Sequence, residues 1–160
     1  MLANLPDSSL TADSTYNSDN RYSASRSRLH TQYDHDTGFG AWTSNNHDAG
    51  WIQADLLNFF FINSVATQGR NHADQWVTSY SLQTGADVSS LAAMLDGAGA
   101  TRVFEANSDR DAVVVNAFDP VRAWVVRLNV VAFHSYPSMR WEVYGCIAGN
   151  YRILPGKRPL

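Results

Sequence analysis

The chain has 160 residues, 44% of them hydrophobic and 17% charged, which suits a single domain with an ordinary apolar core. The formal net charge of −3 argues against a nucleic-acid binder, because such a protein needs a concentrated basic face. The one cysteine, Cys146, excludes an internal disulfide and a zinc site built from several cysteines.

Residues 1–30 are polar and rich in Ser, Asp and Asn, a composition that on its own indicates disorder. Apolar anchors interrupt this stretch, at Leu5, Leu10, Tyr16, Tyr22 and Leu29. We therefore predict an ordered but irregular segment with short strands. Its first residues lack the basic region and apolar run of a signal peptide.

Seven apolar runs bounded by turn residues come next, and they predict strands over 51–56, 59–67, 75–84, 101–105, 112–118, 122–130 and 138–146. Many short strands at such intervals are typical of a sandwich or barrel. The helix-like stretch 89–95 is short, and we expect a connecting turn there. The end of the chain, 147–160, contains Pro and Gly residues and is predicted to be a linker or frayed tail.

The predicted strands contain large aromatic and charged side chains. Seven aromatic residues are expected in or near the core: Trp42, Trp51, Trp76, Trp124, Trp141, Tyr80 and Tyr144. Arg140 and Asp55 also fall within strands, where a charge is costly unless it is paired. We therefore expect both charged side chains to have structural partners.

Several motifs follow one another in a fixed order: Trp51-Ile-Gln-Ala-Asp-Leu56, Gly69-Arg70, Asp74-Gln-Trp-Val-Thr-Ser-Tyr80, Asn116-x-Phe118-x-Pro120 and Arg140-x-Glu142-x-x-Gly145-Cys146. With these motifs, the stretch from about Leu5 to Cys146 resembles the discoidin, or coagulation factor V/VIII C-type, domain. The segment 69–80 looks most like that of the slime-mould discoidin lectins.

The resemblance implies an all-β fold over residues 1–146, an eight-stranded antiparallel β-sandwich with jelly-roll topology, similar to galactose-binding domains. It also implies three ligand-binding loops at one end, which we call spike one (16–23), spike two (33–39) and spike three (69–75). The family usually pairs an early cysteine with the last one, and in this chain Cys146 lacks that partner.

Arg70 in spike three is the first candidate for ligand binding. Its guanidinium can hold a carboxylate or neighbouring sugar hydroxyls in a bidentate fork. The structural alternative is an ion pair with Asp74 or Asp36. An extended loop would place Arg70, His72 and Asp74 on one side, where His72 and Asp74 could hydrogen-bond sugar hydroxyls or remain solvated.

The other candidates come from spikes one and two. Asp36 is a candidate acceptor for ligand hydrogen bonds, and together with Asp34 it could bind structural calcium, although the loop lacks a calcium-binding pattern. Tyr16, Tyr22 and Phe39 could stack on a sugar or line a peptide groove, or pack on neighbouring loops.

The resemblance implies a non-catalytic recognition module for cell adhesion, outside the cell or at its surface as part of a larger protein. We expect it to bind galactose- or N-acetylgalactosamine-type carbohydrate on cell-surface glycans or glycoproteins. The alternatives are a protein partner, such as collagen or a cell-surface receptor, and an anionic phosphatidylserine membrane. The chain contains no Gly-x-Ser-x-Gly elbow, and neither an enzyme nor a cofactor is expected.

Overall fold

The computed structural model describes residues 1–46 and 50–148. Ten strands follow in order: β1 (Leu10–Ala12), β2 (Tyr33–Asp34), β3 (Gly38–Phe39), β4 (Trp42–Thr43), β5 (Trp51–Gln68), β6 (Trp76–Gly85), β7 (Ala92–Ala93), β8 (Val103–Glu105), β9 (Val114–His134) and β10 (Ser138–Ile147). Nearly all of the predicted tail, residues 149–160, lies outside the described part of the chain, so the predicted domain boundary at residue 146 stays a prediction.

The long strands β5 and β9 each change neighbours along their length. The first part of β5 pairs with β1 and with the later part of β9, whereas its second part pairs with β10 and with the start of β9. The pairing register shifts between Asp55 and Phe60, where Leu57 has a φ of 59°. This exchange divides the strands into two antiparallel layers, one with β6, β7 and β8 and the other with β4 and β10. The predicted β-sandwich is confirmed.

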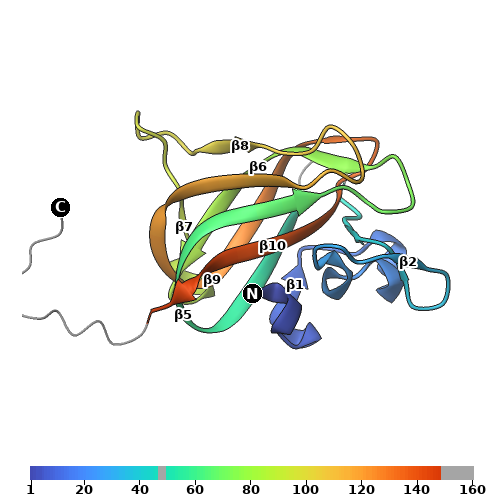
Figure 1. Cartoon of the computed structure of the whole chain (residues 1–160), viewed down its shortest axis with the longest axis horizontal. Coiled ribbons are helices and arrows are strands. Elements are labelled where there is room, and N and C mark those ends of the chain that lie inside the picture. Colours follow the sequence, from blue (N-terminus) through green and yellow to red (C-terminus); the bar gives the residue numbers. More distant parts are fainter. Residues whose placement is uncertain (47–49, 149–160) are drawn as a thin grey trace, which may run out of the picture.

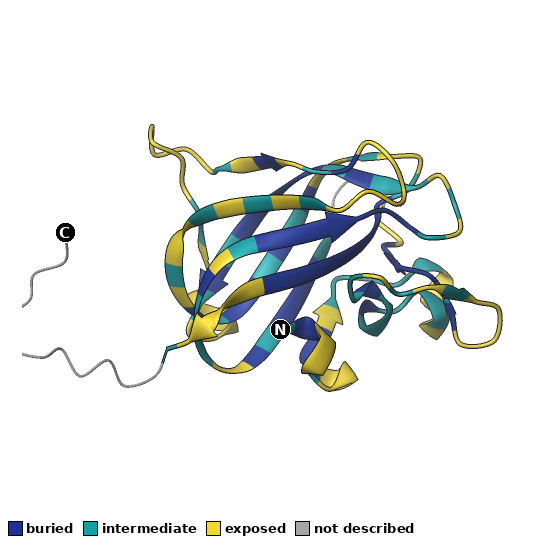
Figure 2. Cartoon of the chain, viewed as in Figure 1, coloured by how far each residue is buried: buried dark blue, intermediate teal, exposed yellow. Residues whose placement is uncertain are grey.

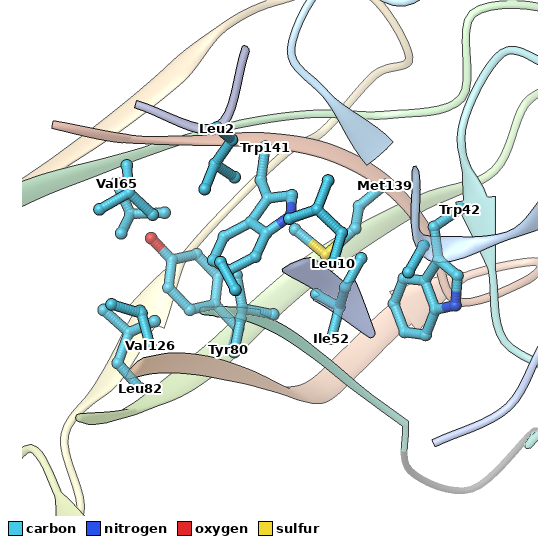
Figure 3. Packing of buried hydrophobic residues seen from close by; sticks show 14 of the residues in the cluster. Leu2, Leu10, Trp42, Ile52, Val65, Tyr80, Leu82, Val126, Met139 and Trp141 are labelled. Carbon is cyan, nitrogen blue, oxygen red and sulfur yellow. The ribbon is translucent and has the colours of Figure 1, made fainter. Parts of the chain in front are cut away.

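The core lies between these layers and is rich in aromatic residues. Figure 3 shows Trp42, Trp141 and Tyr80 packed among aliphatic side chains, and all three are fully buried. In Figure 2 the first part of β9 alternates between intermediate and exposed positions, as expected of a strand with one face toward the core. Trp51, Trp76 and Trp124 are half-buried. The prediction for Tyr144 is wrong, because its side chain is 42% exposed on the outer face of β10.

The N-terminal segment is ordered and irregular, as predicted, and of the short strands expected in residues 1–30 the structure contains one, β1. It contains five 3-10 turns, η1 (Leu2–Asn4), η2 (Asp7–Ser9), η3 (Tyr16–Ser18), η4 (Asn20–Tyr22) and η5 (Ala24–Ser27). Arg28 fixes it by donating to the carbonyl oxygens of Leu2 and Leu5, and the amide of Leu29 donates to the carbonyl oxygen of Trp141 in β10. In Figure 1 the first of these turns lie by the N-terminus and β1, and the later ones lie near β2.

Asp55 has a structural partner of the expected kind. Its carboxylate accepts a hydrogen bond from the indole Nε1 of Trp124 at 2.8 Å and another from the amide of Leu57 at 2.9 Å. The predicted turn over 89–95 contains a 3-10 turn, η6 (Val88–Ser90), followed by the short strand β7. Within the described ranges, no helix has both the length and the hydropathy to cross a membrane.

Candidate functional site

A hollow of about 150 Å³ lies among the loops predicted to be spikes, and we call it the Arg70 pocket. Its walls are formed by six side chains, those of Tyr16, Tyr22, Thr43, Arg70, Gln75 and Tyr136. These residues come from η3, η4, β4, the β5–β6 loop and the β9–β10 loop. The pocket therefore joins segments that are far apart in the sequence.

Spikes two and three are held together by Asn71. Its side-chain Oδ1 accepts a hydrogen bond from the amide of Tyr33 at 2.9 Å, and its own amide donates to the carbonyl oxygen of Gly40. Gly40 has a φ of +75°, which favours glycine, and an added Cβ would lie 3.1 Å from Asn71 Cβ. This close approach fixes the two loops relative to each other.

Arg70 lies in the wall of the pocket and is only 9% exposed. Its Nε donates to the carbonyl oxygen of Phe39 at 2.9 Å, and its Nη1 donates to Oε1 of Gln75 at 2.7 Å. Its Cζ lies 5.0 Å from the ring centre of Tyr22. The guanidinium is therefore surrounded by a carbonyl, an amide and an aromatic ring.

Gln75 connects Arg70 to the opposite wall. Its Oε1 also accepts a hydrogen bond from the hydroxyl of Ser138 at 3.2 Å, and that hydroxyl lies 2.9 Å from Oγ1 of Thr43. A chain of hydrogen bonds thus runs from the arginine through Gln75 and Ser138 to β4. Such a network holds the polar groups of the pocket in place before any ligand arrives.

The aromatic side chains of the pocket form a continuous cluster. The Tyr16 ring centre lies 5.2 Å from that of Tyr22 and 5.5 Å from that of Tyr136, in edge-to-face geometry. Tyr22 in turn contacts Phe39 at 4.8 Å. The adjacent Tyr16 raises the pKa of the Tyr136 phenol above its ordinary value of 10.0. Phe39 thus lies behind the pocket wall, while the three tyrosines line the pocket.

Arg140 is a buried side chain that connects the β5–β6 loop, which forms part of the pocket, to two other segments. It is 1% exposed and donates to the carbonyl oxygens of Gly69 at 2.7 Å, Thr31 at 3.1 Å and Arg110 at 2.7 Å. Burial lowers the pKa of this guanidinium, while the Asp111 carboxylate, 4.0 Å away, acts in the opposite direction. The expected partners of Arg140 are thus mainly backbone carbonyls from three separate segments.

The β5–β6 loop is a tight turn rather than the extended loop that we expected. The amide of Arg70 donates to the carbonyl oxygen of Gln75 at 2.9 Å, and Arg70 is buried while His72 and Asp74 are exposed. The three side chains therefore do not share one side of the loop. His72 stacks on Tyr33 with ring centres 3.8 Å apart, outside the pocket.

Asp74 and Asp36 also lie outside the pocket. Asp74 is 3.5 Å from Nη1 of Arg110, and Asp36 is 3.0 Å from Nδ1 of His35. The structural alternative for Arg70, an ion pair with one of these two carboxylates, is therefore wrong.

Asp34 caps the turn of spike two. Its Oδ1 accepts hydrogen bonds from the amides of Thr37 at 2.9 Å and Asp36 at 3.0 Å, and these bonds lower the pKa of the carboxyl group. One of the carboxylate oxygens that would have to bind calcium, Oδ1 of Asp34, therefore already accepts hydrogen bonds from the backbone. Among the residues that the structure describes, no three His, Cys, Asp or Glu side chains gather as a metal site would require.

Comparison with known proteins supports the resemblance. The family model of the F5/8 type C domain matches residues 9–143 of this chain. The chain belongs to the F5/8 type C domain family. This domain type is a binding module rather than a catalytic domain.

Two relatives of this F5/8 type C domain are similar over most of the chain. Retinoschisin of Mus musculus is 36% identical over 129 residues, which are 78% of this chain and 55% of that protein. The structure of discoidin II from Dictyostelium discoideum has a TM-score of 0.77 and 25% identity, covering 90% of this chain and 57% of that one. The chain thus spans about half the length of these relatives.

A third similarity concerns the fold alone. A Clostridium perfringens module solved in complex with GalNAc-β-1,3-galactose has a TM-score of 0.65 at 18% identity, and it covers 88% of this chain.

Three of the six residues that line the pocket of this F5/8 type C domain were not predicted from the sequence as ligand residues. Thr43, Gln75 and Tyr136 line the pocket but did not belong to the predicted ligand residues. Thr43 directly follows Trp42, which was expected in the core, and Gln75 is the last residue of spike three, so both were adjacent to recognised signals. Tyr136 lies in the β9–β10 loop, where no motif pointed to it.

Proposed function

We propose that this domain is a non-catalytic module that binds carbohydrate of galactose or N-acetylgalactosamine type in the Arg70 pocket. The observation that carries the proposal is the buried guanidinium of Arg70, held by Phe39 and Gln75 in a hollow lined with tyrosines. A sugar offers an apolar ring face and directed hydroxyls. A few placed polar groups among aromatic rings suit such a ligand.

The pocket offers partners for both the apolar C–H groups and the hydroxyl groups of a sugar. The rings of Tyr16, Tyr22 and Tyr136 supply apolar surface for C–H groups, and the hydroxyl of Thr43 and the free N–H groups of Arg70 supply polar partners. The choice of a galactose-type sugar rests on the resemblance of the segment 69–80 to the slime-mould discoidin lectins. The similarity to the structure of discoidin II, over 90% of this chain, supports that resemblance.

The surface of the spikes favours a sugar over a membrane. The large hydrophobic side chains that are strongly exposed include Leu57, Val115 and Ile147, and none of those found in the described residues belongs to the three spikes. Tyr22 and Phe39, the aromatic residues that could have inserted into lipid, are half-buried against each other. A module that inserts into lipid needs apolar side chains exposed at its loop tips.

On this basis, we propose cell-surface glycans or glycoproteins as partners, and an extracellular or cell-surface role in adhesion. The ligand residues in this proposal are Arg70, Tyr16 and Tyr22 in the pocket, with Phe39 behind them. His72, Asp74 and Asp36 would contact only a ligand that extends beyond the pocket, because all three are exposed outside it.

A glycan array tests this proposal. The wild-type chain and an Arg70→Ala variant are applied to the same array, with Arg122→Ala as a matched loss of charge on β9, away from the pocket walls. We expect wild type and Arg122→Ala to bind galactose-type glycans and Arg70→Ala to lose them. If the wild-type chain binds no glycan, the proposal fails, and collagen, receptors and phosphatidylserine vesicles become the ligands to test.

A further inference from the structure

The Arg70 pocket contains one formal charge. Of its six wall residues, Arg70 is the one with a formal charge, and the others are three tyrosines, a threonine and a glutamine. A buried cation without a counter-ion is unfavourable, and proteins usually place a carboxylate beside it. No wall residue of this pocket supplies a carboxylate.

Two carboxylates of the surrounding loops are engaged by other arginines. Asp19 forms an ion pair with Arg21 at 2.7 Å, and Asp74 lies 3.5 Å from Arg110. Among the described residues, none of the ion pairs within 4.0 Å includes Arg70. The charge in the pocket is therefore offset only by neutral acceptors and by aromatic rings.

The guanidinium also has donors left over. An arginine carries five N–H groups. In Arg70, Nε donates to Phe39 and Nη1 to Gln75, and Nη2 makes no hydrogen bond with any described residue. Arg70 lines the pocket and is only 9% exposed, so these donors have little contact with bulk water.

We propose that the ligand of the Arg70 pocket carries a carboxylate, and that its chemical class is an acidic sugar such as a uronic acid. This inference rests on the proposed carbohydrate binding and adds the charge of the sugar to it. A carboxylate is planar, accepts two parallel N–H bonds and neutralises the buried cation. Hydrogen bonds between two charged groups are about twice as strong as those between neutral groups.

The test compares sugars of one stereochemistry that differ in charge. Methyl galactoside, methyl galacturonoside and the methyl ester of that galacturonoside are titrated calorimetrically into the wild-type chain. We expect the galacturonoside to bind at least about tenfold more tightly than the galactoside, since a charge-assisted bond replaces a neutral one. The ester has nearly the same shape without the charge, and it should lose this advantage.

A variant provides a second, internal test. Gln75→Glu would place a carboxylate of nearly the same shape 2.7 Å from Nη1 of Arg70, still able to accept the bond from Ser138. We expect the ratio of galacturonoside to galactoside affinity to fall by at least about tenfold, because the charge of Arg70 is then neutralised within the protein. Arg122→Gln, which removes a cation outside the pocket walls, should leave that ratio unchanged.

The outcomes separate this inference from the proposed function. If the galactoside binds as tightly as the galacturonoside, carbohydrate binding stands and the acidic ligand is ruled out. An affinity ratio that is the same in wild type and Gln75→Glu also overturns the inference. If the wild-type chain binds none of the three sugars, both proposals fail together.

Discussion

Arg140 shows how one buried charged side chain can fix the positions of loops that are far apart in the sequence. The three carbonyl oxygens that it binds belong to the β5–β6 loop, to the segment before β2 and to the β8–β9 loop. Each carbonyl would otherwise be partly buried without a donor. The side chain therefore contributes to stability and also sets the positions of the loops beneath the pocket.

Replacing Arg140 with methionine should therefore destabilise the domain strongly. Arg140→Met keeps an unbranched apolar stem but removes the guanidinium and leaves three carbonyls without their donor, and we expect a loss of about 3 kcal/mol or more in the free energy of unfolding. Urea denaturation measures it. Arg122→Met, at an exposed position, should cost less than about 1 kcal/mol. Equal stability of the two variants would show that the three carbonyls do not need Arg140.

Aspartates that cap turns should make the domain sensitive to acid. Backbone hydrogen bonds from Ala112 and Asp111 lower the pKa of Asp109 below 3.8, and those from Thr37 and Asp36 do the same for Asp34. A carboxyl group with a lowered pKa in the folded state contributes stability above its unfolded value, which is lost as the pH falls through the folded value.

We therefore expect the free energy of unfolding to be smaller at about pH 3 than at about pH 6. Titration by NMR should give midpoints below 3.8 for Asp109 and Asp34. Asp109→Asn cannot ionise, so it should weaken the dependence of stability on pH. Midpoints at or above 3.8 would mean that these turns do not stabilise the charged form.

At the residue scale, the sequence predicted the centre of the pocket but only part of its wall. Arg70, Tyr16 and Tyr22 were named from the family's spike positions, and the structure brings them together. Tyr136 could not be found in this way, because its place depends on the pairing of β9 with β6 and of β10 with β4 at the two ends of its loop. Asp74 was misplaced because the sequence does not show that the loop turns back on itself through the bond from Arg70 to Gln75.

At the scale of elements, spike three depends on a glycine at its first position. A Cβ on Gly69 would lie 2.6 Å from the Cα of Arg110 and 2.9 Å from the carbonyl oxygen of Asp109. Both contacts are with backbone atoms of the β8–β9 loop, which cannot move aside as the end of a side chain can. The absence of a side chain thus lets two loops lie against each other beneath the pocket.

Gly69→Ala should therefore separate these loops and affect both stability and binding. We expect a loss of about 1–3 kcal/mol in the free energy of unfolding, with weaker sugar binding because Arg70 is the next residue. Gly97→Ala is the control, because no atom lies within 4 Å of its added Cβ. Thermal unfolding and a sugar titration of both variants check this. The explanation would be wrong if the two alanine variants behaved alike.

The strands were predicted in the right places but divided differently. The sequence predicted separate strands over 51–56 and 59–67, and the structure joins them as β5, an 18-residue strand that bulges between Asp55 and Phe60. The predicted strands 112–118 and 122–130 are likewise joined in β9. Interruptions such as Asn58 and Pro120 resemble strand ends, but each lies in a bulge, Asn58 in that of β5 and Pro120 in that of β9, and pairing resumes beyond both.

At the scale of the whole molecule, β5 and β9 belong to both layers of the sandwich. Each strand contributes side chains to the core on both sides of its bulge, such as Ile52 and Val65 of β5. Separating the layers would therefore break pairing in the same two strands. We infer that the layers unfold together rather than one after the other.

Hydrogen exchange followed by mass spectrometry can test this cooperation. The amides of β5, β9 and the buried part of β10 should exchange slowest and at similar rates, near the limit set by global unfolding. The short 3-10 turns η3 and η4 should exchange faster, since they have few backbone hydrogen bonds beyond their own turns. Clearly different protection in the two halves of β5 would show that the layers open separately.

The chemistry of the pocket wall has a consequence for how a bound molecule is released. The wall consists of an arginine, three tyrosines, a threonine and a glutamine, so it contains neither a histidine nor a carboxylate. Histidine is the side chain that proteins commonly use to respond to mild acidification. We therefore expect a bound ligand to be released by dilution or by a competing ligand rather than by a mild fall in pH.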